Sequence, residues 1–391
     1  MTTSAELGGA ETSLLTLLRA LRRIVPRWTI TIIAPDKGAF LDRCRDDGFG
    51  VRVIPYPQTV ATLGEPNGAN TGRLANAWNL SRAAVSMWPY LQRLRNELKE
   101  LCATIVHSNG IKAHVATAFT TDKRARLVWH VHEYVGARKV TTRLLRELSS
   151  GPAAVVVNSD SVRQDVENAL GRQRQIRRIH NAVDLALFCP SGDALDLAEL
   201  SGLTSDAGLV RIGLVATFGR WKGHDVFLDA LAQLSTDLPV RGYVIGGPVY
   251  QTSGSQRTLA ELRTYAAQRG LGGRVGFTGH IANVPAAMRA LDVVVHASTC
   301  PEPFGMVIAE GMATGRAVAA VRNGGAQELF EEEVDALGHE MGNARDLARQ
   351  LRRLVTDPIL RRSLSESARP AAERRFSPER MATEFLQVYT G

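Results

Sequence analysis

The feature that most constrains the fold is an alternation of short β-branched runs with longer amphipathic stretches, which occurs twice along the chain. Strands that alternate with helices are typical of parallel α/β sheets. In the first half we predict strands at Trp28–Ile33, Val51–Pro55, Thr104–His107, Arg126–His132 and Ala154–Asn158, and helices at Glu11–Ile24, Leu74–Glu100 and Ser161–Leu170. In the second half we predict strands at Val210–Thr217, Arg241–Ile245, Arg274–Thr278, Val293–His296 and Ala317–Ala320.

The repetition predicts two domains. A chain of 391 residues exceeds what one hydrophobic core usually supports. We therefore predict two doubly wound, Rossmann-like parallel-sheet domains that face each other across a cleft, with Cys189–Gly208 as the linker. Such sheets bind ligands at the carboxyl ends of their strands, so the cleft is the expected site.

The start of the chain departs from this pattern. The turn Gly8-Gly9 follows only the polar stretch Met1–Leu7, where a doubly wound domain normally has a buried first strand. We expect this strand to be missing or truncated, and we hypothesise that the natural protein carries further apolar residues upstream. Genomic sequence with an in-frame stop codon directly upstream would contradict that hypothesis.

Composition narrows the classes of partner. The four cysteines form no CxxC pair and the histidines form no HExxH, so we predict no bound metal and no disulfide framework. Residues 1–185 hold 26 Lys+Arg against 16 Asp+Glu. This excess suits an anionic partner, or is simply a solvated arginine-rich surface. The sequence has no apolar run long enough to cross a bilayer and no signal peptide, so we expect a cytoplasmic protein. We expect no nucleic-acid partner.

The segment from Glu302 to Glu310 has the chemistry of a sugar-phosphate site. We predict that a helix opens near Phe304, so that the amides of Phe304, Gly305 and Met306 form an anion site at its positive end. Glu310 would lie about 9 Å further along the axis at 1.5 Å per residue. Carboxylates accept hydrogen bonds from sugar hydroxyls, so the layout suits a sugar, a diphosphate and a ribose.

This segment resembles the E-x7-E motif of the retaining glycosyltransferases of family 4, which have the GT-B fold. Segments similar to that family occur in order at Gly8-Gly9-Ala10-Glu11, His132-Glu133, Asn181-Ala182-Val183-Asp184, Trp221-Lys222-Gly223, Gly324-Gly325-Ala326-Gln327-Glu328 and Arg375-Phe376-Ser377. The resemblance implies that residues 1–188 form the acceptor-side domain, that 189–370 bind the nucleotide sugar, and that a helix in 371–391 returns to the first domain.

The resemblance also implies roles for single residues. Glu310 would bridge the ribose hydroxyls, Glu302 would hold the donor sugar with the amides of Phe304, Gly305 and Met306, and Lys222 would bind phosphate. The family usually has Gly-Arg where this chain has Ala216-Thr217, so we expect Arg220 to replace that arginine, with a plain surface charge as the alternative. Ala182 also stands where the family has glycine.

In the first domain the resemblance points to the ends of two strands. His132 would contact the donor sugar near the reacting carbon, with a structural histidine as the alternative. Gly8 and Gly9 resemble the glycine loop under the diphosphate and the acceptor, with a plain turn as the alternative, and Asn109 would line the acceptor side.

The expected function is a metal-independent, retaining transfer of a sugar from an NDP-sugar, UDP before GDP, to an acceptor hydroxyl that the sequence does not name. No cofactor is expected beside this donor. The alternatives are another GT-B enzyme, such as a nucleotide-sugar epimerase or a sugar phosphorylase, and a non-catalytic binder of anionic membranes. The segment Gly136–Glu147, with Arg138, Lys139, Arg143 and Arg146, would serve a peripheral contact at the inner face of the membrane.

Overall fold

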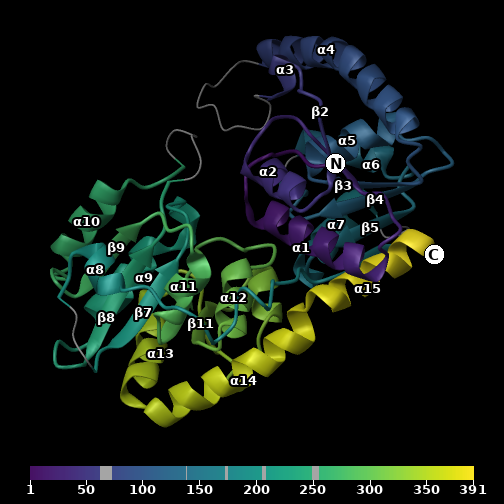
Figure 1. Ribbon diagram of the computed structural model, residues 1–391. Coiled ribbons are helices and arrows are strands. Elements are labelled where there is room, and N and C mark those ends of the chain that lie inside the picture. The colour runs from purple at the N-terminus through teal and green to yellow at the C-terminus, as the bar shows by residue number, and fades with distance from the viewer. Residues whose placement is uncertain (62–72, 138, 172–174, 205–207, 249–254) are drawn as a thin grey trace. The chain divides into compact units, whose positions relative to one another are not determined.

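The computed structural model describes residues 1–61, 73–137, 139–171, 175–204, 208–248 and 255–391. The chain divides into two compact units (Figure 1), of which the first comprises Met1–His180 with Pro378–Gly391 and the second comprises Asn181–Ser377. The break therefore falls at His180, earlier than the expected boundary at residue 188. The segment Cys189–Gly208 is not a free linker as predicted, because it contains α8 (Leu197–Ser201) and Leu197 is buried in the core of the second unit.

The first unit contains two groups of parallel strands. The strands β3 (Ile105–Asn109), β4 (Arg126–Val131), β5 (Ala154–Val157) and β6 (Ile176–Arg178) form one sheet, and β1 (Thr31–Ala34) pairs with β2 (Gly50–Val53). Val106, Trp129 and Val155 pack on one face of the larger sheet with residues of α6 and α7. The helices are α1 (Gly9–Ile24), α2 (Ala39–Asp46), α3 (Gln58–Ala61), α4 (Arg73–Glu100), α5 (Ile111–Thr120), α6 (Lys139–Leu148), α7 (Asp160–Leu170) and α15 (Pro378–Thr390).

The last helix, α15, lies beside α1, as the yellow and purple ribbons of Figure 1 show. Its Phe385 and Tyr389 rings lie against His107, and Phe385 also contacts His130, at centroid distances of 4.8–6.0 Å. Because α15 covers this face of the sheet, the histidines of β3 and β4 are enclosed.

The chain start lies between the two groups of strands. The Thr2 amide donates to the Ile33 carbonyl of β1 at 3.0 Å, and the Asn109 amide of β3 donates to the Met1 carbonyl at 2.8 Å. These two residues run parallel to β3, because Thr2 forms a parallel bridge with Asn109. Among the described residues, no strand lies between β1 and β3, and the isolated bridge of Thr2 with Asn109 is the pairing found there.

The second unit is one six-stranded parallel sheet in the order β12-β11-β10-β7-β8-β9. Its strands are β7 (Val210–Val215), β8 (Val240–Ile245), β9 (Val275–Gly279), β10 (Val293–His296), β11 (Ala317–Val321) and β12 (Leu337–His339). Residues of β10 and β11 are fully buried, as expected for central strands covered on both faces. Its helical elements are α8, η1 (Arg220–Lys222), α9 (His224–Ala232), α10 (Leu259–Gln268), α11 (Val284–Arg289), α12 (Met306–Ala313), η2 (Gly324–Glu328), α13 (Ala344–Thr356) and α14 (Pro358–Phe376).

The helices cover both faces of this sheet. Val293 and Val295 of β10 face a core that includes residues of α9, α10 and α13, whereas Val294 faces residues of α11, α12 and α14. Capping side chains set where helices begin. For example, the Asp357 carboxylate caps α14 by accepting hydrogen bonds from the Ile359 and Leu360 amides. The sheet thereby fixes the loops after β7 and β10, which carry the donor-site residues expected from sequence.

Candidate functional site

The loop after β10 leads into α12 and carries Glu302. The helix begins at Met306, two residues later than predicted, because Gly305 precedes it as the N-cap with φ of 100°. This left-handed conformation suits glycine. Glu310 is therefore about 6 Å along the axis from the first helical residue rather than 9 Å. The Phe304 ring is buried and packs against Phe376, so its side chain is structural and only its backbone is available to a ligand.

Lys222 comes from the turn η1, which follows β7. The next residue, Gly223, has φ of 74°, and a Cβ placed there would lie 1.8 Å from the Ala297 carbonyl oxygen. Glycine thus allows the turn to pass directly against the loop after β10. The Thr299 amide also donates to the Trp221 carbonyl at 2.7 Å. These contacts bring Lys222 to Glu302, and the Lys222 Nζ donates to Glu302 Oε1.

Two residues that sequence reasoning missed also hold Glu302. The Ser298 hydroxyl donates to Glu302 Oε1 at 2.6 Å, and His296 Nε2 lies 3.2 Å from Glu302 Oε2. Burial alone would raise the pKa of Glu302, but His296 and Lys222 together hold it well below its usual range. Glu302 is only 8% exposed and stays ionised. The signal for the missed residues was their place at the end of the predicted strand Val293–His296 and in the loop directly before Glu302.

Glu310 has the opposite environment. Its side chain is half-buried on the second turn of α12, and burial raises its pKa to about 7. In the described part of the chain no group forms a hydrogen bond or an ion pair with its carboxylate. A half-buried carboxylate with no protein donor is suited to accept hydrogen bonds from a ligand.

Arg220 points to a different neighbour. Its guanidinium lies 3.7 Å from Glu261 Oε1 of α10, and both side chains are more than two-fifths exposed. A pair exposed to this degree contributes about 0–1 kcal/mol and is easily exchanged for another partner. The structure therefore places Arg220 in the same turn η1 as Lys222, with its guanidinium near Glu261 of α10.

In the first unit, His132 directly follows β4 and meets the end of β3. Its Nε2 lies 2.6 Å from Oδ1 of Asn109, which can only accept, so Nε2 carries the proton. The buried Nδ1 has no partner in the described residues, and burial lowers the pKa of His132 to about 4. The ring is therefore neutral near pH 7, with a lone pair left on Nδ1. His130 lies on the same face as predicted, at a centroid distance of 3.8 Å.

Gly8 and Gly9 form the start of α1. Gly8 is the N-cap with extended backbone, φ −106° and ψ −177°, a conformation open to any residue. The buried carboxylate of Glu11 accepts from the Thr2 hydroxyl at 3.1 Å and lies within 2.9 Å of a Cβ placed on Gly8. The start of α1 thus already faces a carboxylate of its own chain. Small size, rather than backbone freedom, is what Gly8 contributes here.

The predicted site residues therefore form two sets. The second unit holds Arg220, Lys222, Glu302, Phe304, Gly305, Met306 and Glu310, and the first unit holds Gly8, Gly9, Asn109 and His132. Within the first set, Lys222 and Glu302 are in contact. Among the described residues, no three His, Cys, Asp or Glu side chains are grouped so that they could hold a metal ion. No described helix combines the length and apolarity that crossing a bilayer requires.

Comparisons with known proteins extend over most of the chain. The family model "Glycosyltransferase Family 4" matches residues 7–187, and the model "Glycosyl transferases group 1" matches residues 203–370. The lipopolysaccharide core biosynthesis glycosyltransferase LpsE of Rhizobium meliloti is 30% identical over 236 residues, which are 60% of this chain and 63% of the relative. The D-inositol 3-phosphate glycosyltransferase of Jonesia denitrificans is 33% identical over 249 residues, 61% of this chain and 56% of the relative. These matches span somewhat more than half of each relative's length.

A solved structure is similar over the whole chain. HepE of Anabaena, in complex with UDP and glucose, has a TM-score of 0.81 at 25% identity, covering 100% of this chain and 98% of that one. The same protein was also solved in complex with UDP-glucose. With the parallel sheets of both units and family models that match both halves, the chain belongs to the family 4 glycosyltransferases, which have the GT-B fold.

Proposed function

We propose that the chain is a retaining, metal-independent glycosyltransferase that moves a hexosyl or related sugar from a UDP-sugar to an acceptor hydroxyl. The observation that carries this proposal is the pairing of Lys222 with Glu302 just before α12, while Glu310 on the same helix has no partner among the described residues. UDP is favoured over GDP because HepE, at 25% identity, binds UDP-glucose. Dependence of UDP release on an acceptor would separate this activity from that of an epimerase.

The donor would lie along the start of α12. Glu310 would accept from the ribose hydroxyls, while Glu302 and the amides of Phe304, Gly305 and Met306 would hold the sugar. An ammonium has three donors, so Lys222 can contact the diphosphate and still hold Glu302. Arg220 would add a second positive charge after leaving Glu261.

The proposed reaction keeps the anomeric configuration. The bond between the anomeric carbon and the diphosphate oxygen breaks, the acceptor oxygen bonds the same face of that carbon, and the diphosphate takes the acceptor's proton. Lys222 would stabilise the charge that grows on the diphosphate, where electrostatic stabilisation is most effective. His132, in the tautomer that the Asn109 side chain fixes, would serve the donor sugar near the reacting carbon. Gly8, Gly9 and Asn109 would serve the acceptor side.

The anomer formed by slow hydrolysis of UDP-glucose tests the stereochemistry without a known acceptor. Proton NMR of the wild-type protein with UDP-glucose should show α-glucose before mutarotation produces the β anomer. β-Glucose as the first product would contradict retention. A matched sample of Lys222→Ala should form glucose much more slowly, which excludes a contaminating hydrolase as the source.

We also propose that the protein acts at the cytoplasmic side and contacts anionic membrane through α6. Val140 is 68% exposed and Leu144 is 40% exposed one turn later, beside the exposed Arg143. Arg138, which belongs to the same predicted surface, lies outside the described residues. Sedimentation with phosphatidylserine vesicles should fall for Val140→Glu/Leu144→Glu relative to wild type, and equal sedimentation at low salt would contradict the contact.

A further inference from the structure

Four polar side chains share one face of the larger sheet in the first unit. Residues two apart on a strand point to the same face, so His107 and Asn109 of β3 lie beside His130 and His132 at the end of β4. His130 is fully buried, and neither of its ring nitrogens has a partner among the described residues. The His130 ring therefore contacts its neighbours by packing rather than through hydrogen bonds.

The orientation of the His132 ring depends on two contacts. A hydrogen bond holds its Nε2 at 2.6 Å from Oδ1 of Asn109, but the ring can still turn about that bond. The second contact is the His130 ring, whose centroid lies 3.8 Å from that of His132 at an interplanar angle of 47°. Contacts at two points of a ring define its plane as well as its position. His130 is therefore the neighbour that sets which way the His132 ring faces.

The His130 ring is held in turn by two other rings. Phe385 of α15 lies at a centroid distance of 4.8 Å and an interplanar angle of 61°. His107 of β3 lies at 5.2 Å and 82°. Both are edge-to-face arrangements, which aromatic rings prefer over face-to-face stacking. The position of His130 therefore depends on α15 as well as on the neighbouring strand.

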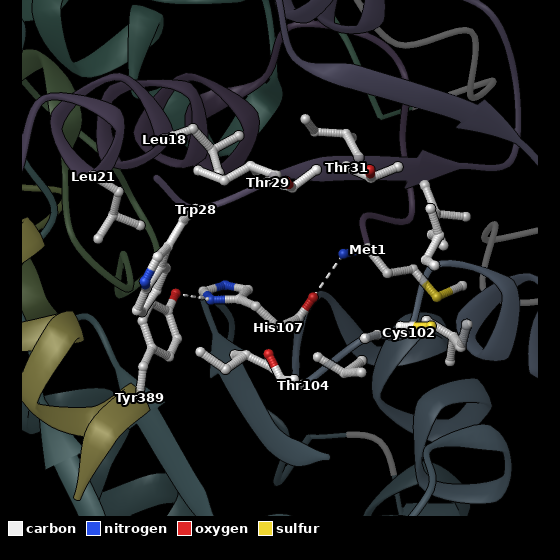
Figure 2. A pocket seen from close by; sticks show the side chains of 18 of the residues that line it. Met1, Leu18, Leu21, Trp28, Thr29, Thr31, Cys102, Thr104, His107 and Tyr389 are labelled. Atoms are coloured by element: carbon white, nitrogen blue, oxygen red, sulfur yellow. Dashed lines mark hydrogen bonds between the residues drawn. The ribbon is translucent and has the colours of Figure 1, made fainter. Parts of the chain in front are cut away.

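The helix α15 also fixes His107. The Tyr389 hydroxyl lies 2.6 Å from Nδ1 of His107, and Figure 2 shows this hydrogen bond at the wall of a cavity of about 570 Å³ that both residues line. Burial raises the pKa of Tyr389, so its hydroxyl stays protonated. Phe385 and Tyr389 are four residues apart and lie on one face of α15. Arg126 fastens the helix to β4, because its Nε donates to the Val388 carbonyl at 2.7 Å.

The histidine rings are neutral near pH 7. Burial lowers the pKa of His132 to about 4 and that of His114 on α5 to about 3, and it holds the pKa of His107 and of His130 well below the usual range. The Met1 amino group donates to the His107 carbonyl, and burial lowers its pKa to about 5. Packing rather than charge therefore holds these rings together, and a His132 ring open to water would regain a higher pKa.

We propose that His130 and Phe385 are positioning residues for His132: Phe385 of α15 holds the His130 ring, and the His130 ring sets the orientation of His132 beside the donor sugar. This inference rests on the role proposed for His132 in sugar transfer. The last helix thereby contributes to the site without touching the substrate. Because His130 acts through the shape of its ring, another ring in the same place should replace it.

Variants that remove or keep the ring test the proposal by steady-state kinetics of UDP-glucose hydrolysis. His130→Ala and Phe385→Ala should lower kcat about tenfold or more with KM within about twofold, because a misplacement of about 1 Å can cost about 10²-fold. His130→Phe should keep kcat within about threefold of wild type, since a swap that keeps the ring is tolerated best. Met381 is as fully buried on α15, one turn before Phe385. Met381→Ala should therefore lower Tm as Phe385→Ala does but keep kcat.

The titration of His132 gives a second readout, which does not depend on activity. NMR of the protein labelled at histidine, with the His132 signal assigned by its loss in His132→Gln, should give a pKa of about 4 in wild type. In His130→Ala and Phe385→Ala water reaches the loosened ring, so this pKa should rise by about one unit or more towards 6.5. In His130→Phe and Met381→Ala it should stay as in wild type.

A lower Tm of His130→Ala and Phe385→Ala with unchanged kcat and an unchanged His132 pKa would overturn the proposal, because the two rings would then only fill the core. His130→Phe as impaired as His130→Ala would also overturn it, since the imidazole nitrogens would then be what matters. If His132→Ala hydrolyses UDP-glucose as fast as wild type, the proposed role of His132 fails, whereas the titration still decides whether His130 and Phe385 hold its ring.

Discussion

At the scale of single residues, the candidate donor site depends on two carboxylates with different environments. Glu302 is paired with Lys222, His296 and Ser298, which keep it ionised. Glu310, eight residues later, has no such partners in the described chain, and burial raises its pKa. One carboxylate is thus fixed by the protein, while the other is left for a ligand.

Lys222→Ala should lower kcat strongly with a smaller effect on KM, because the ammonium acts on charge that grows in the transition state. Loss of one such group typically reduces kcat by about 10²–10³-fold. Steady-state kinetics of UDP-glucose hydrolysis give kcat and KM for the wild-type protein and for Lys222→Ala. Arg211→Ala, which removes an exposed ion pair with Asp292 on the same unit, should keep kcat within about twofold and serves as the matched control. Full activity of Lys222→Ala at saturating donor would exclude the proposed role.

Glu310 gives the donor affinity a pH dependence. A carboxyl whose pKa is raised from 4.5 to about 7 by folding is mostly protonated at pH 6 and mostly ionised at pH 8. The ionised form accepts stronger hydrogen bonds, by about 1 kcal/mol, so UDP-glucose should bind about fivefold more tightly at pH 8 than at pH 6. Calorimetry on Glu310→Gln should show no such change.

The same group predicts a change in stability. Because the folded state binds this proton more tightly than the unfolded state, the contribution of Glu310 falls as pH rises from about 4.5 to 7. The free energy of unfolding of Glu310→Gln, measured with urea, should therefore decline less over this window than that of wild type. Parallel pH profiles of the two proteins would show that the pKa of Glu310 is not raised.

At the scale of elements, the donor site depends on the close contact between the turn η1 and the loop after β10, which a glycine allows. Gly223 ends η1 with φ of 74°, and its missing side chain admits the Ala297 carbonyl. The long, strongly apolar strands were predictable, and Val293–His296 was predicted with its observed bounds. The three-residue strands β6 and β12 were not, because so short an edge strand has no measurable alternation. The helix α8 was hidden by the Pro, Gly and Asp residues around it.

Gly223→Ala should destabilise the second unit and displace Lys222. Its Cβ would lie 1.8 Å from a backbone oxygen, so the turn must move, at a cost of about 3 kcal/mol or more. Gly270→Ala is the matched control, since Gly270 also has positive φ, 69°, but nothing lies within 4 Å of its Cβ position. Thermal unfolding should show a much larger fall in Tm for Gly223→Ala. Equal falls would mean that backbone strain alone, and not the contact with Ala297, matters.

At the scale of the whole molecule, the fold and the family followed from the order of weak motifs along the chain. Glu302 and Lys222 could be placed from the sequence because each lies in a loop that follows a strand of a doubly wound sheet, and Glu310 because it lies on the helix into which the loop after β10 leads. The contacts of His296 and Ser298 with Glu302 were not, since they depend on how the loop after β10 folds back on itself. The boundary between the units lies at His180 rather than at residue 188, whereas α15, inside the expected returning segment 371–391, belongs to the first unit.

The central claim is that a nucleotide sugar binds beside Lys222, Glu302 and Glu310, and calorimetric titration of UDP-glucose tests it most directly. Wild-type protein and Arg211→Ala should bind with the same affinity, whereas Glu310→Ala should bind at least tenfold more weakly at pH 8, since a hydrogen bond to a charged group contributes about 1.5–3 kcal/mol. Binding that is equally tight in Glu310→Ala, or no binding of any UDP- or GDP-sugar to the wild-type protein, would contradict the account.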